Sequence, residues 1–167
     1  AVLNDPESKS PLILFSPEGG MDIEEIAENH PDRLMRVAVD IRHGFDEASV
    51  RKALPASDDV NDDDIVSALG KLYQAYIDND AELMEINPLV VTDDGRLLAL
   101  DCKFTLDDSA IKRRTELAEN GTPDKLTGLE AKAKEIGFKY IELDGDVGIL
   151  ANGAGLTMTS MDAVRHY

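Results

Sequence analysis

Apolar residues recur at helical spacing over one long segment in the middle of the chain. The segment reads DDVNDDDIVSALGKLYQAYIDND and begins at Asp58. Its apolar positions lie on one face of a helix of about four to five turns. These positions are Ile65, Val66, Leu69, Leu72, Tyr73, Tyr76 and Ile77. The spacing therefore predicts an amphipathic helix that packs on a core.

The acidic run before this helix has the alternating oxygen ligands of a calcium loop at Asp59, Asn61 and Asp63. A calcium loop of that type needs glycine at its sixth position and glutamate at its twelfth. The chain has Asp64 and Gly70 at those two positions. We therefore expect an Asn or Asp cap, followed by a first helical turn whose carboxylates favour the helix N-terminus.

Shorter apolar runs precede the helix and predict two strands with a helix between them. Strand-like runs cover 11–16 and 33–40, and an amphipathic pattern covers 21–29, with Met21, Ile23 and Ile26 inward and Pro31 after its end. Gly19 and Gly20 lie in the loop after the first strand. They fit a close backbone approach to a phosphate, or simply a tight turn from strand to helix.

Two strand-like runs after the helix, at 81–92 and 96–103, are separated by Asp93-Asp94-Gly95. A three-residue connection that ends in glycine is typical of a hairpin with a type I turn and a glycine bulge. In that register Asn87 lies opposite Asp101, and Glu85 projects to the same face. Cys102 alternates to the other face, where we expect a small buried side chain.

A carboxamide oxygen and one or two carboxylates that converge on one point are hard oxygen ligands suited to Mg²⁺. The hairpin therefore predicts a magnesium site made by Asn87 and Asp101, with Glu85 beside it. Pro88 removes a ladder hydrogen bond, so this part of the strand is expected at an edge or a bulge. The alternative is that these side chains form an ordinary solvated polar face.

The last third of the chain predicts helices and strands in alternation. A short helix is expected from Leu106–Ser109 to Arg114, a connecting helix at 125–136, strands at 140–143 and 147–151, and a helix from Leu156. Asn152 lies in a Gly-rich turn between the last strand and the last helix, where free N–H groups and the helix dipole favour an anion.

The charge of the chain narrows its possible partners. It has 34 acidic and 17 basic residues, for a net charge of −17, which excludes nucleic-acid binding through a basic patch. A high-salt cytoplasm and an ordinary acidic protein both fit this excess. Cys102 is the one cysteine, and the chain shows neither a spanning segment nor a signal sequence, so we expect no membrane and a cytoplasmic or organelle-matrix location.

Three motifs together resemble one family. The sequence Glu85-Ile86-Asn87-Pro88-Leu89, with Asp101 fourteen residues after Asn87, is similar to the metal-binding hairpin of the ATP-grasp domain in succinyl-CoA synthetase β subunits. Residues 147–161, VGILANGAGLTMTSM, resemble the opening of the flavodoxin-like second domain of that subunit. Residues 16–25, SPEGGMDIEE, resemble a stretch upstream of the hairpin. The residues after Asp101 and the segment 115–138 depart from the family pattern.

This resemblance implies an α/β fold with a mixed or antiparallel ATP-grasp sheet at 1–124, a connecting helix at 125–139 and the start of a flavodoxin-like CoA-ligase domain at 140–167. It implies that Asn87 and Asp101 bind the Mg²⁺ of ATP/ADP or GTP/GDP, that Glu85 supports them, and that Asn152 contacts the organic acid. The implied partner is an α subunit that binds CoA and carries the phosphohistidine, so His30, His43 and His166 are expected to be surface or capping residues.

The family's β subunit extends beyond this chain at both ends, so the resemblance implies a middle fragment without a complete nucleotide pocket. The implied enzyme is a succinate–CoA ligase, ADP- or GDP-forming, of the tricarboxylic acid cycle. Two alternatives stay open from the sequence. One is a related acid–CoA ligase, such as one that uses malate. The other is a non-catalytic acidic module that docks a partner subunit.

Overall fold

The computed structural model describes residues 1–18, 23–56, 60–122 and 126–166 of the chain. Contacts divide the chain into two compact units, Ala1–Gly121 and Thr122–Tyr167. Each unit is described by itself. None of the helices in the described ranges is both long enough and apolar enough to cross a membrane.

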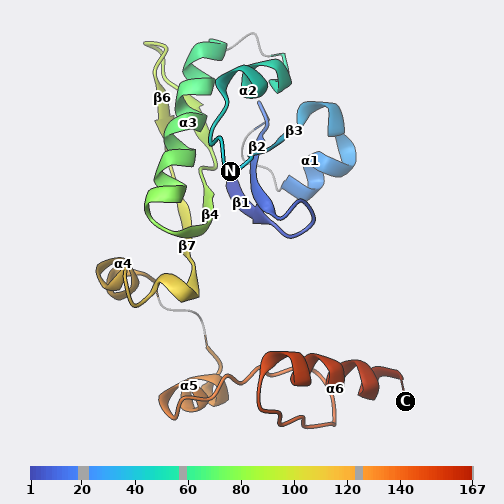
Figure 1. The fold of residues 1–167 in the computed structure, drawn as a ribbon. Helices are drawn as coiled ribbons and strands as arrows, with labels where there is room; N and C mark the ends of the chain where they lie inside the picture. Colours follow the sequence, from blue (N-terminus) through green and yellow to red (C-terminus); the bar gives the residue numbers. More distant parts are fainter. Residues whose placement is uncertain (19–22, 57–59, 123–125, 167) are drawn as a thin grey trace. The chain divides into compact units, whose positions relative to one another are not determined.

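The first unit is built on an antiparallel sheet with the strand order β3-β2-β1-β4-β7 and a separate two-stranded ladder, β5-β6 (Figure 1). Its strands are β1 (Val2–Asp5), β2 (Ser10–Phe15), β3 (Met35–Ala38), β4 (Ala81–Glu85), β5 (Leu89–Val91), β6 (Leu97–Ala99) and β7 (Lys103–Leu106). Its helices are α1 (Ile23–Asn29), α2 (Glu47–Ala53), α3 (Asp62–Asp78) and α4 (Thr115–Asn120), with 3-10 turns η1 (Pro31–Arg33) and η2 (Asp108–Ala110). This arrangement agrees with the predicted α/β class with an antiparallel sheet.

The long predicted helix is α3, and its start is set by the residues that the sequence indicated. The side chain of Asn61 accepts a hydrogen bond from the Asp63 N–H at 2.9 Å, and three aspartates form the first turn. Asp59, part of the same acidic run, lies outside the described residues. The helix therefore begins with a cap and favourable charges at its N-terminus.

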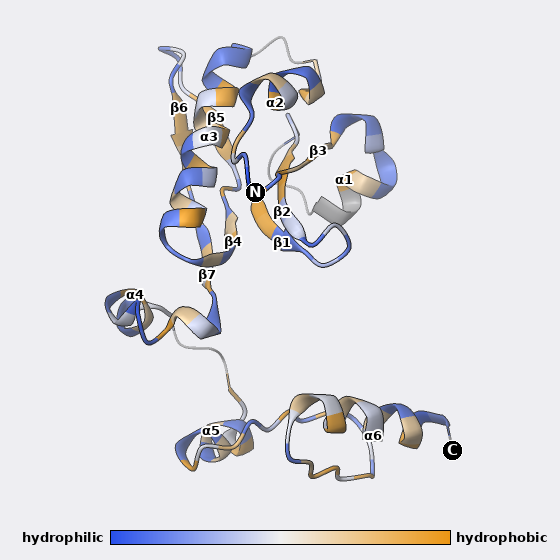
Figure 2. Ribbon diagram, in the orientation of Figure 1, coloured by the Kyte–Doolittle hydropathy of each residue, from blue (hydrophilic) through white to orange (hydrophobic). Residues whose placement is uncertain are grey.

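The core lies between α3 and the sheet. Six of the seven predicted apolar positions of α3 are buried, while Ile77 is 44% exposed, so its predicted burial is wrong. Ile77 lies in the last turn of α3, where its neighbour Tyr76 is the buried residue. From the sheet, Val2 and Ile13 are fully buried. Figure 2 shows apolar and polar residues alternating along α3, as expected for a helix with one buried side.

The predicted helix at 21–29 is described from Ile23 to Asn29, and Ile26 is buried as expected. Met21, Gly19 and Gly20 lie outside the described residues. The short helix predicted to end at Arg114 is present only as the 3-10 turn η2, and α4 begins after it at Thr115. Among the strands and α-helices of this unit, β1, α2 and α4 were not predicted. The strand β1 forms the middle of the sheet, where it pairs with both β2 and β4.

The second unit holds α5 (Gly128–Glu135) and α6 (Ala154–His166), which agree with the two helices predicted there. Thr127 and Glu130 form a reciprocal capping box at the start of α5.

The two strands predicted in this unit, 140–143 and 147–151, are wrong, because the described residues of this unit form no strand. Ile141 and Leu150 in these segments are 65% and 86% exposed. Figure 2 shows further apolar residues along the extended segment before α6. The apolar runs suit buried strands, but no neighbouring strand pairs with them in this unit, so no ladder forms.

Candidate functional site

The predicted hairpin is divided into two ladders that share one register. Glu85 pairs with Lys103 at the end of the β4–β7 ladder, and Leu89 pairs with Ala99 at the start of the β5–β6 ladder. Each strand contains three residues between these pairs, so the register passes through the break unchanged. Asn87 and Asp101 are the middle residues of the two interruptions. The break therefore places them opposite each other, as the sequence predicted.

The interruption is centred on the Asn87–Pro88 peptide bond, which is cis. Proline has no N–H to give to the ladder. Its carbonyl still accepts a hydrogen bond from the Leu100 N–H at 3.3 Å, which holds the two strands together beside the break. Regular pairing resumes at Leu89. The edge or bulge expected at Pro88 is thus a short gap in the sheet, between two paired segments.

The turn that fixes this register is the predicted three-residue connection. The Thr92 N–H donates to the Arg96 carbonyl at 2.9 Å, and the Gly95 N–H donates to the Thr92 carbonyl at 2.8 Å. Gly95 has φ +80°, a left-handed conformation that glycine adopts without strain. Asp94 accepts hydrogen bonds from the Thr92 hydroxyl and from Arg96. The polar groups of the turn are therefore satisfied locally, and the register does not depend on distant contacts.

Asn87 and Asp101 differ in their surroundings. Asn87 is half-buried and lines a cavity, whereas Asp101 is exposed and accepts a hydrogen bond from the Cys102 N–H at 2.8 Å. Cys102 is also exposed, so its predicted burial is wrong. The reason is its place in the sheet, because β7 is an edge strand and nothing in the described first unit covers the side chains of the segment that enters it.

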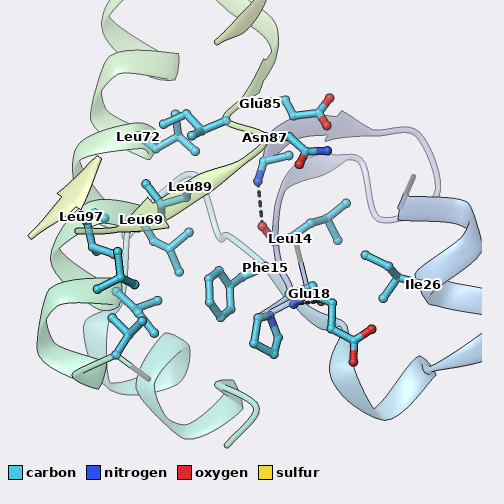
Figure 3. A pocket seen from close by; sticks show the side chains of 18 residues that line it. Leu14, Phe15, Glu18, Ile26, Leu69, Leu72, Glu85, Asn87, Leu89 and Leu97 are labelled. Atoms are coloured by element: carbon cyan, nitrogen blue, oxygen red, sulfur yellow. Dashed lines mark hydrogen bonds between the residues drawn. The ribbon is translucent and has the colours of Figure 1, made fainter. Parts of the chain in front are cut away.

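The cavity beside Asn87 has a volume of about 230 Å³ and lies between the strands and α3 (Figure 3). Most of its lining is apolar, with Leu14 and Phe15 from β2, Leu69 and Leu72 from α3, and Leu89 and Leu97 from the β5–β6 ladder. Its polar side chains come from Ser16, Glu18, Glu85 and Asn87. In Figure 3, Glu85 and Asn87 project to the same side of their strand. The cavity is thus an apolar space with a polar rim.

Glu18 belongs to this rim but was not predicted as a site residue. Its N–H donates to the Ser16 hydroxyl at 3.1 Å, and its carboxylate lies 3.4 Å from Nε of Arg33. The signal in the sequence is its position within the stretch 16–25, which resembles the family. Only the folded chain brings that segment next to the hairpin.

The donor set at the break fits a magnesium ion. An amide oxygen from Asn87 and a carboxylate from Asp101 are hard ligands of the kind that Mg²⁺ takes in proteins. No group of three or more His, Cys, Asp or Glu side chains in the described ranges could enclose a metal ion. A metal held by two protein ligands must therefore complete its shell with water and phosphate oxygens, as Mg²⁺ does beside nucleotides.

A family model described as an ATP-grasp domain matches residues 1–91. The chain belongs to the ATP-grasp domain family. The match covers most of the first unit, including the Asn87 side of the hairpin and all the residues that line the cavity except Leu97. The predicted partner residue Asp101 lies beyond the matched range, so its assignment rests on the register and on the motif.

The ATP-grasp chain is similar over nearly its whole length to β subunits of succinate–CoA ligase (ADP-forming). It is 42% identical to that of Nautilia profundicola, 46% to that of Rubrobacter xylanophilus and 43% to that of Pyrobaculum aerophilum. These matches cover 97%, 98% and 100% of the chain but only 42%, 43% and 45% of the relatives. The chain thus spans less than half the length of these curated relatives.

One solved structure supports the fold. It is ATP citrate lyase from Methanothrix soehngenii in complex with citrate and coenzyme A, with a TM-score of 0.58 over 81% of this chain and 31% of that chain. Because the two sequences are 24% identical, this likeness shows the fold alone.

Asn152, the predicted acid-binding residue, lies in the second unit. It is exposed and directly precedes Gly153, which has φ +123° and leads into α6. The Gly153 carbonyl accepts bonds from the Thr157 N–H at 3.1 Å and from its hydroxyl at 3.0 Å. Asn152 is therefore placed at a helix N-terminus, as predicted.

The three histidines lie on the surface, as expected. His30, His43 and His166 are all exposed. Nδ1 of His43 lies 3.2 Å from the Asp40 carboxylate, and His30 precedes η1 without a side-chain cap bond.

Proposed function

We propose that this ATP-grasp chain is part of the nucleotide-binding β subunit of an ADP-forming succinate–CoA ligase. The reaction would be reversible, with succinyl-CoA, ADP and phosphate on one side and succinate, CoA and ATP on the other. An α subunit would bind CoA and carry the phosphohistidine. The observation that carries the proposal is the pair Asn87 and Asp101, which a shared register holds opposite each other. The similar proteins named as β subunits of ADP-forming succinate–CoA ligase support the proposal.

In this proposal Asn87 and Asp101 hold Mg²⁺, which neutralises negative charge on the phosphoryl group that is transferred. Glu85 lines the cavity beside Asn87 and lies on the same face, so it would orient the site or a bound water. ATP, with ADP as its product, is the proposed nucleotide because the relatives described above are named as ADP-forming.

The second unit would supply the contact to the acid. Residues 125–139 would connect the ATP-grasp part to a flavodoxin-like CoA-ligase domain that begins at 140. The exposed amide of Asn152 and the N–H groups at the start of α6 suit a carboxylate. A cytoplasmic or organelle-matrix location belongs to the same proposal.

The direct test uses the full-length subunit that contains this chain, assembled with its α subunit. Asp101→Ala is expected to reduce transfer of labelled phosphate from ATP to the α-subunit histidine to background, because it removes one of two protein ligands. Asp93→Ala is the matched control, since Asp93 is an exposed carboxylate in the turn of the same hairpin. Both variants should keep the wild-type circular dichroism spectrum. Equal phosphorylation of the two variants would contradict the metal assignment.

The acid is tested separately in the same complex. Succinate should give a higher kcat/KM than malate, because the relatives described above are named for succinate. A higher kcat/KM with malate would identify malate as the substrate, and it would not contradict the metal assignment.

A further inference from the structure

Lys103 is the first residue of β7 and the register partner of Glu85. Directly paired residues of an antiparallel ladder project to the same face of the sheet. Figure 3 shows Asn87 on the same side of its strand as Glu85, and Asp101 lies two residues before Lys103 in the interrupted segment opposite Asn87. The break in the hairpin therefore assembles one ammonium group beside the two proposed metal ligands and a carboxylate.

Two of the three ionisable groups that line the cavity are the carboxylates of Glu18 and Glu85. The third is the α-amino group of Ala1, which donates to the Leu14 carbonyl and whose pKa burial lowers to about 6, so its positive charge is weakened at neutral pH. Arg33 pairs with Glu18, with Nε of Arg33 3.4 Å from that carboxylate. A nucleoside triphosphate at the rim would meet these carboxylates with its own negative charge, and one Mg²⁺ cancels only part of the repulsion.

Lys103 is available to bind an anion. Its side chain is exposed, and within the described parts of the chain it forms no hydrogen bond or ion pair with another residue. Glu85, which pairs with Lys103 in the β4–β7 ladder, is half-buried and lines the cavity. An exposed lysine can turn its long side chain toward a ligand at the rim, and its ammonium group binds phosphate as a compact point charge.

We propose that Lys103 binds the terminal phosphate oxygens of the nucleotide whose metal is held by Asn87 and Asp101. This inference rests on the proposed function and adds to it a phosphate-binding residue on the second strand of the hairpin. Lys103 donates N–H bonds to oxygens of the phosphoryl group, while Mg²⁺ and Lys103 together offset the charge of Glu85 and Glu18.

The test measures nucleotide affinity by titration calorimetry in the full-length subunit that contains this chain. Lys103→Met keeps the apolar stem and removes the charge, and Lys103→Arg keeps the charge. Lys71→Met is the matched control, because Lys71 is an exposed lysine on α3 outside this cavity. Each variant is titrated with Mg·ATP and with AMP, which lacks the terminal phosphates.

Lys103→Met is expected to weaken Mg·ATP binding about tenfold, the loss typical of one charge-assisted hydrogen bond. AMP affinity should stay within about twofold of wild type, and Lys103→Arg should restore most of the Mg·ATP affinity. Lys71→Met should bind both nucleotides like the wild type.

Two results would overturn the inference while leaving the proposed function in place. One is equal Mg·ATP affinity in Lys103→Met and Lys71→Met. The other is an equal loss for AMP and Mg·ATP in Lys103→Met, which would indicate a structural role. A wild-type subunit that does not bind Mg·ATP at all would instead overturn the proposed function, and the inference with it.

Discussion

Glu85 pairs with Lys103 at the last position of the β4–β7 ladder, two residues before Asn87 on one strand and two residues after Asp101 on the other. This pairing fixes the geometry of the break, because regular pairing resumes in the same register at Leu89 and Ala99. The gap lies between two paired segments, so the pairing on both sides of it fixes the positions of Asn87 and Asp101 along their strands.

Tyr76 links α3 to β1, and its hydroxyl group donates a hydrogen bond to the side-chain oxygen of Asn4. Tyr76→Phe removes this bond from a residue that is only 3% exposed, so we expect a loss of about 1 kcal/mol in the free energy of unfolding. Urea unfolding measures this loss. Tyr73→Phe is the control, because Tyr73 is also buried but its hydroxyl has no hydrogen-bond partner among the described residues. Equal losses in the two variants would contradict a role for the Asn4 bond.

Asp80 ties the end of α3 to the segment after β7. Arg113 donates to one carboxylate oxygen at 2.8 Å, and Nε of Arg114 donates to the other at 2.7 Å. These hydrogen bonds, first those from Arg113 and then those from Arg114, hold the pKa of Asp80 well below its usual range. A carboxylate with a lowered pKa in the folded state stabilises the fold at neutral pH. This contribution begins to be lost as the pH falls below about 4, the ordinary pKa of aspartate.

We therefore expect Asp80→Asn to lower the urea midpoint at pH 7 and the difference from wild type to shrink toward pH 3. Asparagine suits this position, because Asp80 has φ +51° and asparagine tolerates the left-handed region. Asp40→Asn is the control, since Asp40 pairs with Arg42 only two residues away and that pair needs little folding to form. A difference from wild type that does not change with pH would contradict the assignment to Asp80.

The acidic surface makes stability depend on salt. A net charge of −17 on 167 residues favours unfolding through self-repulsion, and added salt screens it. We expect the urea midpoint to rise as KCl increases from about 0.05 to 1 M, with the same rise in NaCl, because screening depends on ionic strength. A midpoint that still rises above about 1 M would favour adaptation to high salt. A plateau would favour an ordinary acidic protein. An unchanged midpoint would contradict self-repulsion.

Local signals predicted the parts of the fold that local physics controls. The helix α3 follows from the period of its apolar residues and from the cap at Asn61. The hairpin register follows from a three-residue turn with glycine at its left-handed position, Gly95. These features need no information from distant residues, which is why the positions of Asn87 and Asp101 could be derived from the sequence.

The elements that the sequence did not predict depend on distant partners. β1 has only four residues, and it is a strand because β2 and β4 pair with it on both sides. The apolar runs at 140–143 and 147–151 show the reverse case, since strand-like patterns do not form strands without neighbours. Glu18 reaches the cavity only through the fold. One missed element did carry a local signal, because Asp46 caps α2 through the N–H groups of Ala48 and Ser49.

The central claim is that the break in the hairpin binds a divalent metal, and Mn²⁺ titration followed by NMR tests it most directly. We expect paramagnetic broadening of backbone amides to centre on Asn87 and Asp101. This broadening should occur at lower Mn²⁺ concentrations than broadening near the acidic first turn of α3. It should be lost in Asp101→Ala and kept in Asp93→Ala. Broadening that spreads over the acidic surface without a maximum at the break, or that survives Asp101→Ala, would contradict the claim.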